Sequence, residues 1–384
     1  RRFLHGLCYA RAWWHALRWV RRHRPDWVLL GDLEHRCDAW AVAWLRRRGV
    51  AIADICHNPA MFDRRLWRGM HRQQTSELPD SGPQKSAPSA AGWGPRALGA
   101  SLPRDPQPLT RPAAWRQRAL SRFDVTFVHA AALAAQVAQF TRHPPVVIPH
   151  GNESLFLAAE TPGPDWRHRW GWPAGRRAAL LFGTLTEYKG LPTLIAALAA
   201  MPPAARPGVV VAGFPAADVD PRRWRQLATE HSLDAWLRWE LTYIPSPQVA
   251  GLFRAVDFVV LPYWEASQSG VAHLALTFSR PVIATTTGGL PEVIHSEENG
   301  LLVPPRDAAA LAGALERMTS SAALLGRLSA GAAASCRAHD WDAIAARMRG
   351  HFLACGAATT PAGHANRAGC PAATATASVP PEPN

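Results

Sequence analysis

Three polar turns in the second half of the sequence combine residue types that bind anionic or hydroxylated ligands. They are FGTLTEYKG from Phe182 to Gly190, EASQSGV from Glu265 to Val271 and TTTGGLPE from Thr285 to Glu292. Glycine lets a ligand approach the backbone closely, and the N–H groups at a helix start attract anions. Turns that follow the strands of one parallel sheet lie at its carboxyl edge, where ligands bind in such sheets. The stretch from Pro262 to Pro304, which contains the second and third turns, therefore predicts a binding crevice.

The first turn predicts a phosphate site. A buried strand ends at Gly183, Thr184 follows, and Lys189 stands near the start of the next helix. Only Lys85 and Lys189 are lysines among the 42 basic residues, so a lysine in this turn indicates a need for a compact point charge. The alternative is a solvated lysine on a surface turn. The turn lacks the Gly-x4-Gly-Lys-Ser/Thr spacing of a P-loop.

The other two turns offer acids beside helix starts. In the second, Glu265 can accept hydrogen bonds from sugar hydroxyls, and Ser269, Gly270 and Val271 open a helix with N–H donors. The alternative is an ordinary N-cap serine beside a solvated glutamate. In the third, a capping role for Glu292 is at least as well supported as a ligand role.

Histidines follow strands in the first half of the chain. His57 comes after the strand from Val50 to Cys56 and suits hydrogen bonding and proton transfer near neutral pH. His129 and His150 also follow strands and are weaker candidates. Asp218-Val219-Asp220 resembles a metal-binding pair of acids, but solvated loop acids account for it better. No His, Cys or Asp cluster has metal spacing, so we predict no metal site.

Alternating strand and helix patterns predict an α/β fold of two doubly wound, Rossmann-like domains that face each other across a cleft. The predicted parts are a first domain (1–148) with a flexible insertion (76–112), a connector (149–177), a second domain (178–340), a terminal helix (341–353) and a disordered tail (354–384).

The bulk composition narrows the class of protein. The net charge of +13 favours an anionic partner, although heavy arginine use contributes to it. No recognisable nucleic-acid-binding module is present, so nucleic acid is not the favoured partner. The six cysteines lack paired spacing, which indicates reduced thiols and a cytoplasmic protein. The apolar runs are shorter than the ~20 residues that span a bilayer.

Four segments of the second domain, 182–190, 254–263, 269–284 and 288–307, resemble the donor-binding domain of family 4 glycosyltransferases of the GT-B fold. The resemblance implies a retaining transferase that uses a nucleotide-diphosphate sugar without an obligatory metal or other cofactor. It also implies that the terminal helix (341–353) packs back on the first domain. It implies that Lys189, in the turn of Gly183 and Thr184, binds the diphosphate and that Glu265 contacts the sugar. Ser269, Gly270 and Val271 would offer N–H groups to the sugar or phosphate, and His57 would lie near the anomeric carbon and the acceptor.

Three features depart from the family pattern. Thr184 stands where an arginine commonly follows the glycine. A second glutamate is missing, since His273 or Leu274 occupies its position depending on the alignment, although Ser-Gln-Ser-Gly-Val resembles a sub-group without that acid. No opening strand with a Gly-rich turn precedes Ala10, so we expect the first domain to lack its N-terminal units.

The sequence leaves more than one function open. The leading hypothesis is a glycosyltransferase acting on a glycan; the alternative is a degenerate or truncated GT-B protein that binds nucleotide or a partner without turnover. A third hypothesis keeps the GT-B fold but changes the reaction to that of a nucleotide-sugar epimerase or a phosphorylase. A phosphorylase needs a pyridoxal lysine, and the one lysine of the second domain already stands in the predicted phosphate turn. The basic, Trp-rich segments 11–24 and 64–72 suit an anionic membrane surface, or else helices that bury their tryptophans. With the membrane, the acceptor would be a lipid-linked glycan or cell-surface polysaccharide precursor, at the inner face of the cell membrane.

Overall fold

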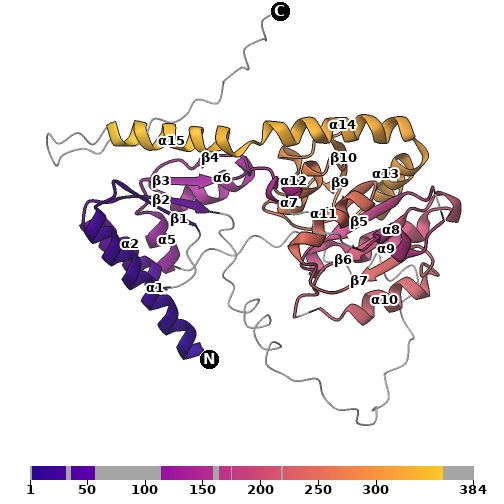
Figure 1. Ribbon diagram of the computed structural model, residues 1–384, viewed down its shortest axis with the longest axis horizontal. Helices are drawn as coiled ribbons and strands as arrows, with labels where there is room; N and C mark the ends of the chain where they lie inside the picture. The colour runs from indigo at the N-terminus through magenta and orange to yellow at the C-terminus, as the bar shows by residue number, and fades with distance from the viewer. Residues whose placement is uncertain are drawn as a thin grey trace, which may run out of the picture. The chain divides into compact units, whose positions relative to one another are not determined.

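The computed structural model describes residues 2–31, 36–56, 114–158, 164–173, 175–217 and 219–357. These form two compact units (Figure 1). The first contains the described residues up to Pro149 and those from Asp342 onward, and the second runs from His150 to Trp341. His57, Asp218, the predicted insertion at 76–112 and the sequence beyond 357 lie outside the described residues.

The first unit is built on a parallel four-stranded sheet in the order β1-β2-β3-β4. Its elements are α1 (Arg2–His23), β1 (Trp27–Gly31), α2 (Arg36–Arg47), β2 (Ala51–Cys56), α5 (Ala114–Leu120), β3 (Val125–Val128), α6 (Ala131–Val137), the 3-10 turn η1 (Ala138–Phe140) and β4 (Val146–Val147). Strand β3 is buried along its whole length. Because its residues are apolar apart from Thr126, they pack on both faces of the sheet.

The second unit is built on a parallel six-stranded sheet in the order β10-β9-β8-β5-β6-β7. Its strands are β5 (Ala178–Phe182), β6 (Gly208–Ala212), β7 (Leu237–Glu240), β8 (Phe258–Leu261), β9 (Val282–Thr285) and β10 (Gly300–Val303). The first strand of this sheet, β5, lies inside it. Strands β6 and β7 follow on one side of β5, and β8, β9 and β10 follow on the other side. This parallel arrangement in both units confirms the predicted α/β fold.

Helices cover both faces of the second sheet. They are α7 (Leu155–Ala158), α8 (Trp166–Trp170), η2 (Glu187–Lys189), α9 (Leu191–Ala200), η3 (Pro203–Ala205), α10 (Pro221–Glu230), α11 (Ser246–Ala255), α12 (Gly270–Thr277), η4 (Leu290–Glu292), α13 (Ala308–Ser320) and α14 (Ala322–Ala338). The side chains of consecutive strand residues point to opposite faces of the sheet. Leu181 packs against α9 in the apolar cluster on one face, and Leu180 packs against α12 in the cluster on the other.

Several elements differ from the sequence prediction. The predicted connector contains α7 and α8, because Trp166 and Trp170 are buried in the core of the second unit. The turn before Glu292 leads into the single 3-10 turn η4 instead of an α-helix. The last helix, α15 (Trp341–Ala357), extends past the predicted start of the tail at 354.

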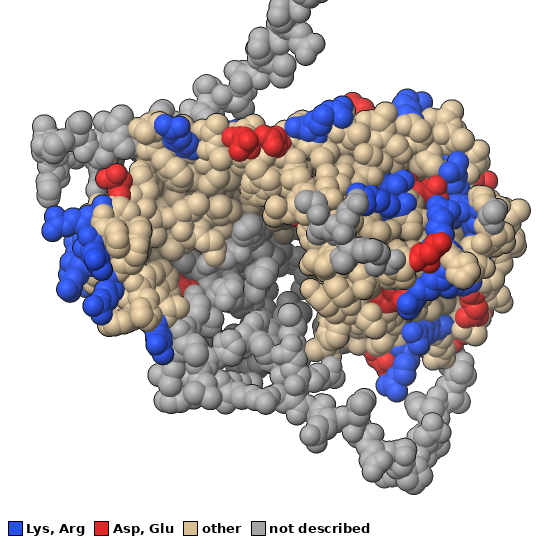
Figure 2. All heavy atoms as spheres, viewed as in Figure 1, with Lys and Arg blue, Asp and Glu red and all other residues tan. Residues whose placement is uncertain are grey.

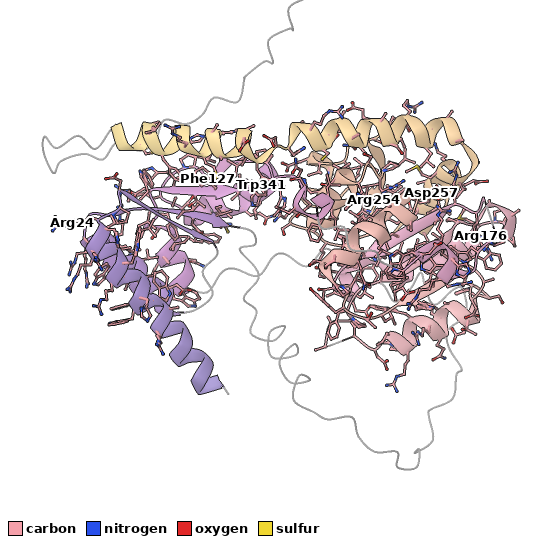
Figure 3. The ribbon with its side chains drawn as sticks, viewed as in Figure 1. Arg24, Phe127, Arg176, Arg254, Asp257 and Trp341 are labelled. Atoms are coloured by element: carbon pink, nitrogen blue, oxygen red, sulfur yellow. The ribbon has the colours of Figure 1, made fainter. Side chains whose placement is uncertain are left out.

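Helix α15 packs its apolar residues on the first sheet. The ring of Phe352 lies 5.6 Å from that of Phe127 on β3 and 4.9 Å from that of Trp27 on β1. Figure 3 labels Phe127 beneath this helix. Trp341 begins the helix inside the second unit, where its indole N–H donates to the carbonyl of Asn152 at 2.7 Å. No described helix combines the length and apolar character needed to cross a membrane.

Candidate functional site

The polar turns meet where the strand order of the second sheet reverses. Strands β5 and β8 are neighbours in the sheet, although about 75 residues of chain separate them. The loop after β5 carries Gly183 and Lys189, and the loop after β8 carries Glu265 and Ser269. Loops that leave adjacent parallel strands at such a switch point enclose a crevice suited to ligands. The sheet topology therefore brings two of the predicted motifs to one place.

Lys189 is held with its ammonium group inside this turn. The side chain is 6% exposed, and Nζ donates a hydrogen bond to the carbonyl oxygen of Phe182 at 2.8 Å. Nζ also lies 5.2 Å from the centre of the Tyr263 ring. Burial lowers the pKa of Lys189 from 10.5 to about 8. This cation has exchanged water for a carbonyl and an aromatic ring, so an anion that reaches it meets a poorly hydrated charge.

Gly183 brings Lys189 and the start of α12 together. Its φ is +103°, a conformation that favours glycine. A β-carbon added at Gly183 would lie 2.8 Å from Nζ of Lys189 and 3.5 Å from Cγ2 of Val271. The ammonium group of Lys189 and the side chain of Val271, in the first turn of α12, thus both lie close to Gly183. This convergence is the central feature of the candidate site.

Helix α12 begins near Gly183, because Val271 in its first turn lies close to that glycine. Ser269 is its N-cap, and the side chain accepts a hydrogen bond from the N–H of Ala272. The N–H groups in the first turn of an α-helix have no partner within the helix and carry a partial positive charge. Gly270 is exposed, and a β-carbon there would meet nothing within 4 Å. The predicted cap and the predicted donor role of this turn are therefore compatible.

The third turn supports the loop that carries Glu265. Gly288 has φ of +54°, and a β-carbon there would overlap the carbonyl oxygen of Ala266. The N–H of Gly289 donates to the carbonyl of Ser267 at 3.0 Å. The hydroxyl of Thr285 donates to the carbonyl of Tyr263 at 2.7 Å. The loop after β9 thus holds in place the loop that carries the half-buried Glu265. The sequence did not reveal this structural role.

Trp264 joins the loop after β8 to the lysine turn. Its backbone N–H donates to the carbonyl of Tyr188 at 2.7 Å, and its indole N–H donates to the hydroxyl of Thr193 at 2.9 Å. Gly190, with φ of +71°, packs so closely that a β-carbon would lie 1.9 Å from the carbonyl oxygen of Pro262. Glu265 follows directly after this junction, so its position relative to Lys189 is fixed.

The positions that depart from the family pattern have distinct surroundings. Thr184 is exposed at the end of β5. Leu274 is buried in the apolar cluster around α12. His273 is 3% exposed and stacks on His150, with ring centroids 4.7 Å apart and an interplanar angle of 25°. The ring of His339 lies 5.3 Å from His273 on another side. His273 thus packs against other histidines, and no second carboxylate stands at either aligned position.

The remaining candidates lie elsewhere. His129 belongs to the first unit, where Nδ1 lies 3.3 Å from the carbonyl oxygen of Ile148. Asp220 caps α10 and pairs with Arg222, whose hydrogen bonds lower the pKa of that exposed carboxylate. This is the loop-acid role that the sequence favoured for it. Within the described part of the chain, no three His, Cys, Asp or Glu side chains are grouped so that they could hold a metal ion.

Comparison with known proteins connects this geometry to a family. Residues 176–321 match the family described as "Glycosyl transferases group 1". D-inositol 3-phosphate glycosyltransferase of Thermomonospora curvata is 32% identical over 189 residues, 47% of this chain and 44% of that protein. The same enzyme of Corynebacterium efficiens is 29% identical over 201 residues, 50% of this chain and 47% of that protein. The chain spans about half the length of the curated relatives it matches.

Solved structures share the fold across most of the chain. Sucrose-phosphate synthase from Thermosynechococcus elongatus has a TM-score of 0.62 and 22% identity, covering 89% of this chain and 76% of its own. HepE from Anabaena, solved with UDP, has a TM-score of 0.61 and 16% identity, covering 89% and 81%. These two similarities extend through both units. Residues 176–321 thus resemble group 1 glycosyltransferases, and the chain as a whole shares the fold of these solved GT-B glycosyltransferases.

Proposed function

We propose that this protein is a retaining glycosyltransferase that moves a sugar from a nucleotide-diphosphate sugar to a glycan acceptor. The observation that carries the proposal is that the Lys189 ammonium group and the first turn of α12 both lie beside Gly183, at the end of β5. A diphosphate bound there would meet a poorly hydrated cation and a helix N-terminus. Both groups favour negative charge, as the leaving nucleoside diphosphate requires.

The proposed chemistry divides among three groups. When the bond from the anomeric carbon to the diphosphate oxygen breaks, charge develops on the leaving group, where Lys189 and the N–H groups of Ser269, Gly270 and Val271 stabilise it. Glu265 accepts hydrogen bonds from the sugar hydroxyls and orients the sugar. We assign His57 the role that the family resemblance implies, beside the anomeric carbon and the acceptor. The charge on the diphosphate is then neutralised without an obligatory metal or other cofactor.

UDP-sugars are the first donors to test. HepE structures are described in complex with UDP and with UDP-glucose. These neighbours are only 16% identical to the chain, so they support the class of donor through the shared fold and not the particular sugar. GDP- and ADP-sugars belong in the same experiment because the described site identifies groups for the diphosphate and the sugar, and none that selects a base.

We propose a lipid-linked glycan or a cell-surface polysaccharide precursor as the acceptor. One fold neighbour, WaaG, is described as a glycosyltransferase involved in lipopolysaccharide biosynthesis. Such an acceptor would place a cytoplasmic enzyme at the inner face of the cell membrane. The curated relatives are named for a different acceptor, D-inositol 3-phosphate, which makes that compound the first soluble acceptor to compare.

A thermal-shift screen followed by turnover tests the function. A matching donor at saturating concentration should raise the melting temperature of wild type by mass action, and Lys189→Ala should lose that shift. Release of sugar from the same donor should fall in Glu265→Gln and stay unchanged in Glu316→Gln, which alters an exposed acid on α13. NMR of the first product then gives the anomeric configuration. An inverted product would refute the retaining mechanism.

Binding without turnover is the second candidate. Thr184 replaces a commonly basic position, and His273 and Leu274 leave no second carboxylate for the donor ribose. If UDP-sugar stabilises wild type through Lys189 while neither hydrolysis nor transfer occurs, the protein is a nucleotide-binding member of the fold. If no nucleotide sugar stabilises wild type, both candidates fail.

A further inference from the structure

Helix α1 has a buried face and an exposed face of different chemistry. On the buried face, Leu17 and Val20 belong to the core of the first unit, and the indole N–H of Trp13 donates to the buried carboxylate of Asp38 at 2.8 Å. Trp14 and Trp19 point the other way and are 55% and 54% exposed. The tryptophans of this helix are therefore divided, and packing in the first unit accounts for Trp13 but not for Trp14 or Trp19.

The exposed face combines these two tryptophans with arginine. Arg11, Arg18 and Arg22 are exposed, and helical spacing places them between Trp14 and Trp19 on the helix surface. The guanidinium of Arg18 lies 5.3 Å from the Trp14 ring, and His23 stacks on Trp19 at 4.4 Å. The sequence of α1 contains no acidic residue. The face is thus cationic and aromatic along several turns.

The neighbouring helix α2 extends the same chemistry. Trp40 is 60% exposed, and Arg48 lies 4.7 Å above the ring of Trp44. Arg47 and Arg48 end the α2 segment on its exposed side, and Arg24, labelled in Figure 3, follows α1. Basic side chains gather on the surface around these two helices (Figure 2). The single acid of α2, Asp38, is buried against Trp13 and does not offset this charge at the surface.

We infer that the exposed face of α1 docks on an anionic lipid bilayer. Indole rings prefer the headgroup region, where an apolar body meets water, and arginines beside them are attracted to anionic headgroups. Helix α1, at 22 residues, is about 33 Å long. It is too polar to enter the hydrocarbon, so it lies in the interface plane and not across it. The positive charge of this face favours an anionic bilayer over a protein partner, because such a protein would need an acidic groove that also buries two tryptophans.

This inference rests on the proposed acceptor, because an enzyme that glycosylates a lipid-linked substrate must reach the bilayer surface. It concerns a surface of the first unit, whereas the donor crevice lies in the second. A failure of lipid binding therefore leaves donor binding untouched. Conversely, docking could be observed even if no nucleotide sugar bound to Lys189.

Vesicle co-sedimentation of the full 384-residue chain tests the docking surface. Wild type should sediment with phosphatidylcholine vesicles that contain phosphatidylglycerol and remain in solution with phosphatidylcholine alone. The variant Arg18→Glu/Arg22→Glu should lose at least about fivefold in partitioning for each arginine changed. Trp14→Ser/Trp19→Ser should keep its salt-sensitive attraction but bind more weakly and lose the blue shift of tryptophan fluorescence on vesicles.

A matched charge control lies on the other unit. Arg223 and Arg225 are exposed on α10, so Arg223→Glu/Arg225→Glu makes the same change in net charge. This control should sediment nearly as wild type does. Equal losses in the two arginine variants would mean that only overall charge attracts the protein, and the inference would be wrong. Wild-type sedimentation that ignores lipid charge would also overturn it. A circular dichroism spectrum and a melting temperature like those of wild type verify that each variant is folded.

Discussion

The indole N–H of Trp264 donates to the hydroxyl of Thr193 at 2.9 Å, which links the loop after β8 to the first turn of α9. Lys189 lies four residues before Thr193, and Glu265 directly follows Trp264. Arg306 stacks on the other side of this link, with its guanidinium 4.8 Å from the Trp264 ring. Together with the backbone hydrogen bond from Trp264 to Tyr188, this bond helps to set the spacing between the proposed diphosphate contact and the proposed sugar contact.

Breaking this hydrogen bond should weaken donor binding without abolishing it. Trp264→Phe keeps an aromatic ring under Arg306 but removes the indole donor, and Thr193→Val removes the acceptor. Each change should raise the dissociation constant by about fivefold, since one such bond contributes about 1 kcal/mol. Calorimetry on the double variant should show no further loss, because both changes remove the same bond. Losses that simply add would refute the link.

Donor binding should weaken as the pH rises through about 8. In the free protein burial lowers the pKa of Lys189 from 10.5 to about 8, so the ammonium form that binds a diphosphate becomes scarce above that pH. The dissociation constant should then rise by up to about tenfold per pH unit. Lys189→Arg should bind more weakly but lose this pH dependence, because an arginine keeps its charge.

The stability of the free protein should change in the opposite direction. Because the folded pKa is below the unfolded one, the unfolded chain holds the Lys189 proton more tightly between pH 8 and 10.5. This lysine therefore makes the free energy of unfolding rise with pH in that window. Below pH 8 the lysine is charged in both states, and burial of that charge lowers the free energy of unfolding most. Urea unfolding of wild type and Lys189→Met at several pH values isolates the effect. Parallel pH curves for the two proteins would contradict it.

The loop that carries Glu265 should depend on Gly288. A β-carbon there overlaps the carbonyl oxygen of Ala266, and φ of +54° is unfavourable for alanine. Gly288→Ala should therefore lower the free energy of unfolding by at least about 2 kcal/mol. Gly313→Ala is the matched control: its β-carbon meets nothing within 4 Å inside α13, so it should stabilise by up to about 1 kcal/mol. Chemical denaturation of both variants measures the difference.

His273 should matter for stability and not for donor binding. It is buried and its ring contacts those of His150 and His339, so His273→Leu removes two ring contacts and should cost about 1 kcal/mol. The dissociation constant for the donor should stay within about twofold of wild type. A large loss of donor affinity, with stability preserved, would mean that His273 does contact the donor.

Much of the second unit could be predicted because its signals are local. The apolar strand before Gly183 and the serine cap at Ser269 are read within a few residues of sequence, and the structure has the corresponding elements. Helix α8 was missed although Asp165 caps its start and Gly171, with φ of +63°, ends it. That cap signature was present in the sequence, but proline and tryptophan around it suggested an irregular connector.

The site itself required strand order, which local patterns do not contain. Gly183 meets Val271 because β5 and β8 are neighbours in the sheet, and no spacing in the sequence expresses that. The stacking of His150 on His273 depends on packing between α12 and a distant loop. Gly288 could be recognised as a turn glycine, yet its role in holding the Glu265 loop depends on a contact 22 residues away.

Titration of wild type and Lys189→Ala with UDP, monitored by calorimetry, tests the central claim most directly. Arg223→Ala on α10 serves as the control for loss of one positive charge. We predict that wild type and the control bind UDP alike and that Lys189→Ala binds at least about tenfold more weakly, as expected when one buried contact to a charged group is lost. Equal affinity of wild type and Lys189→Ala for UDP would contradict the proposal that this crevice holds a nucleoside diphosphate.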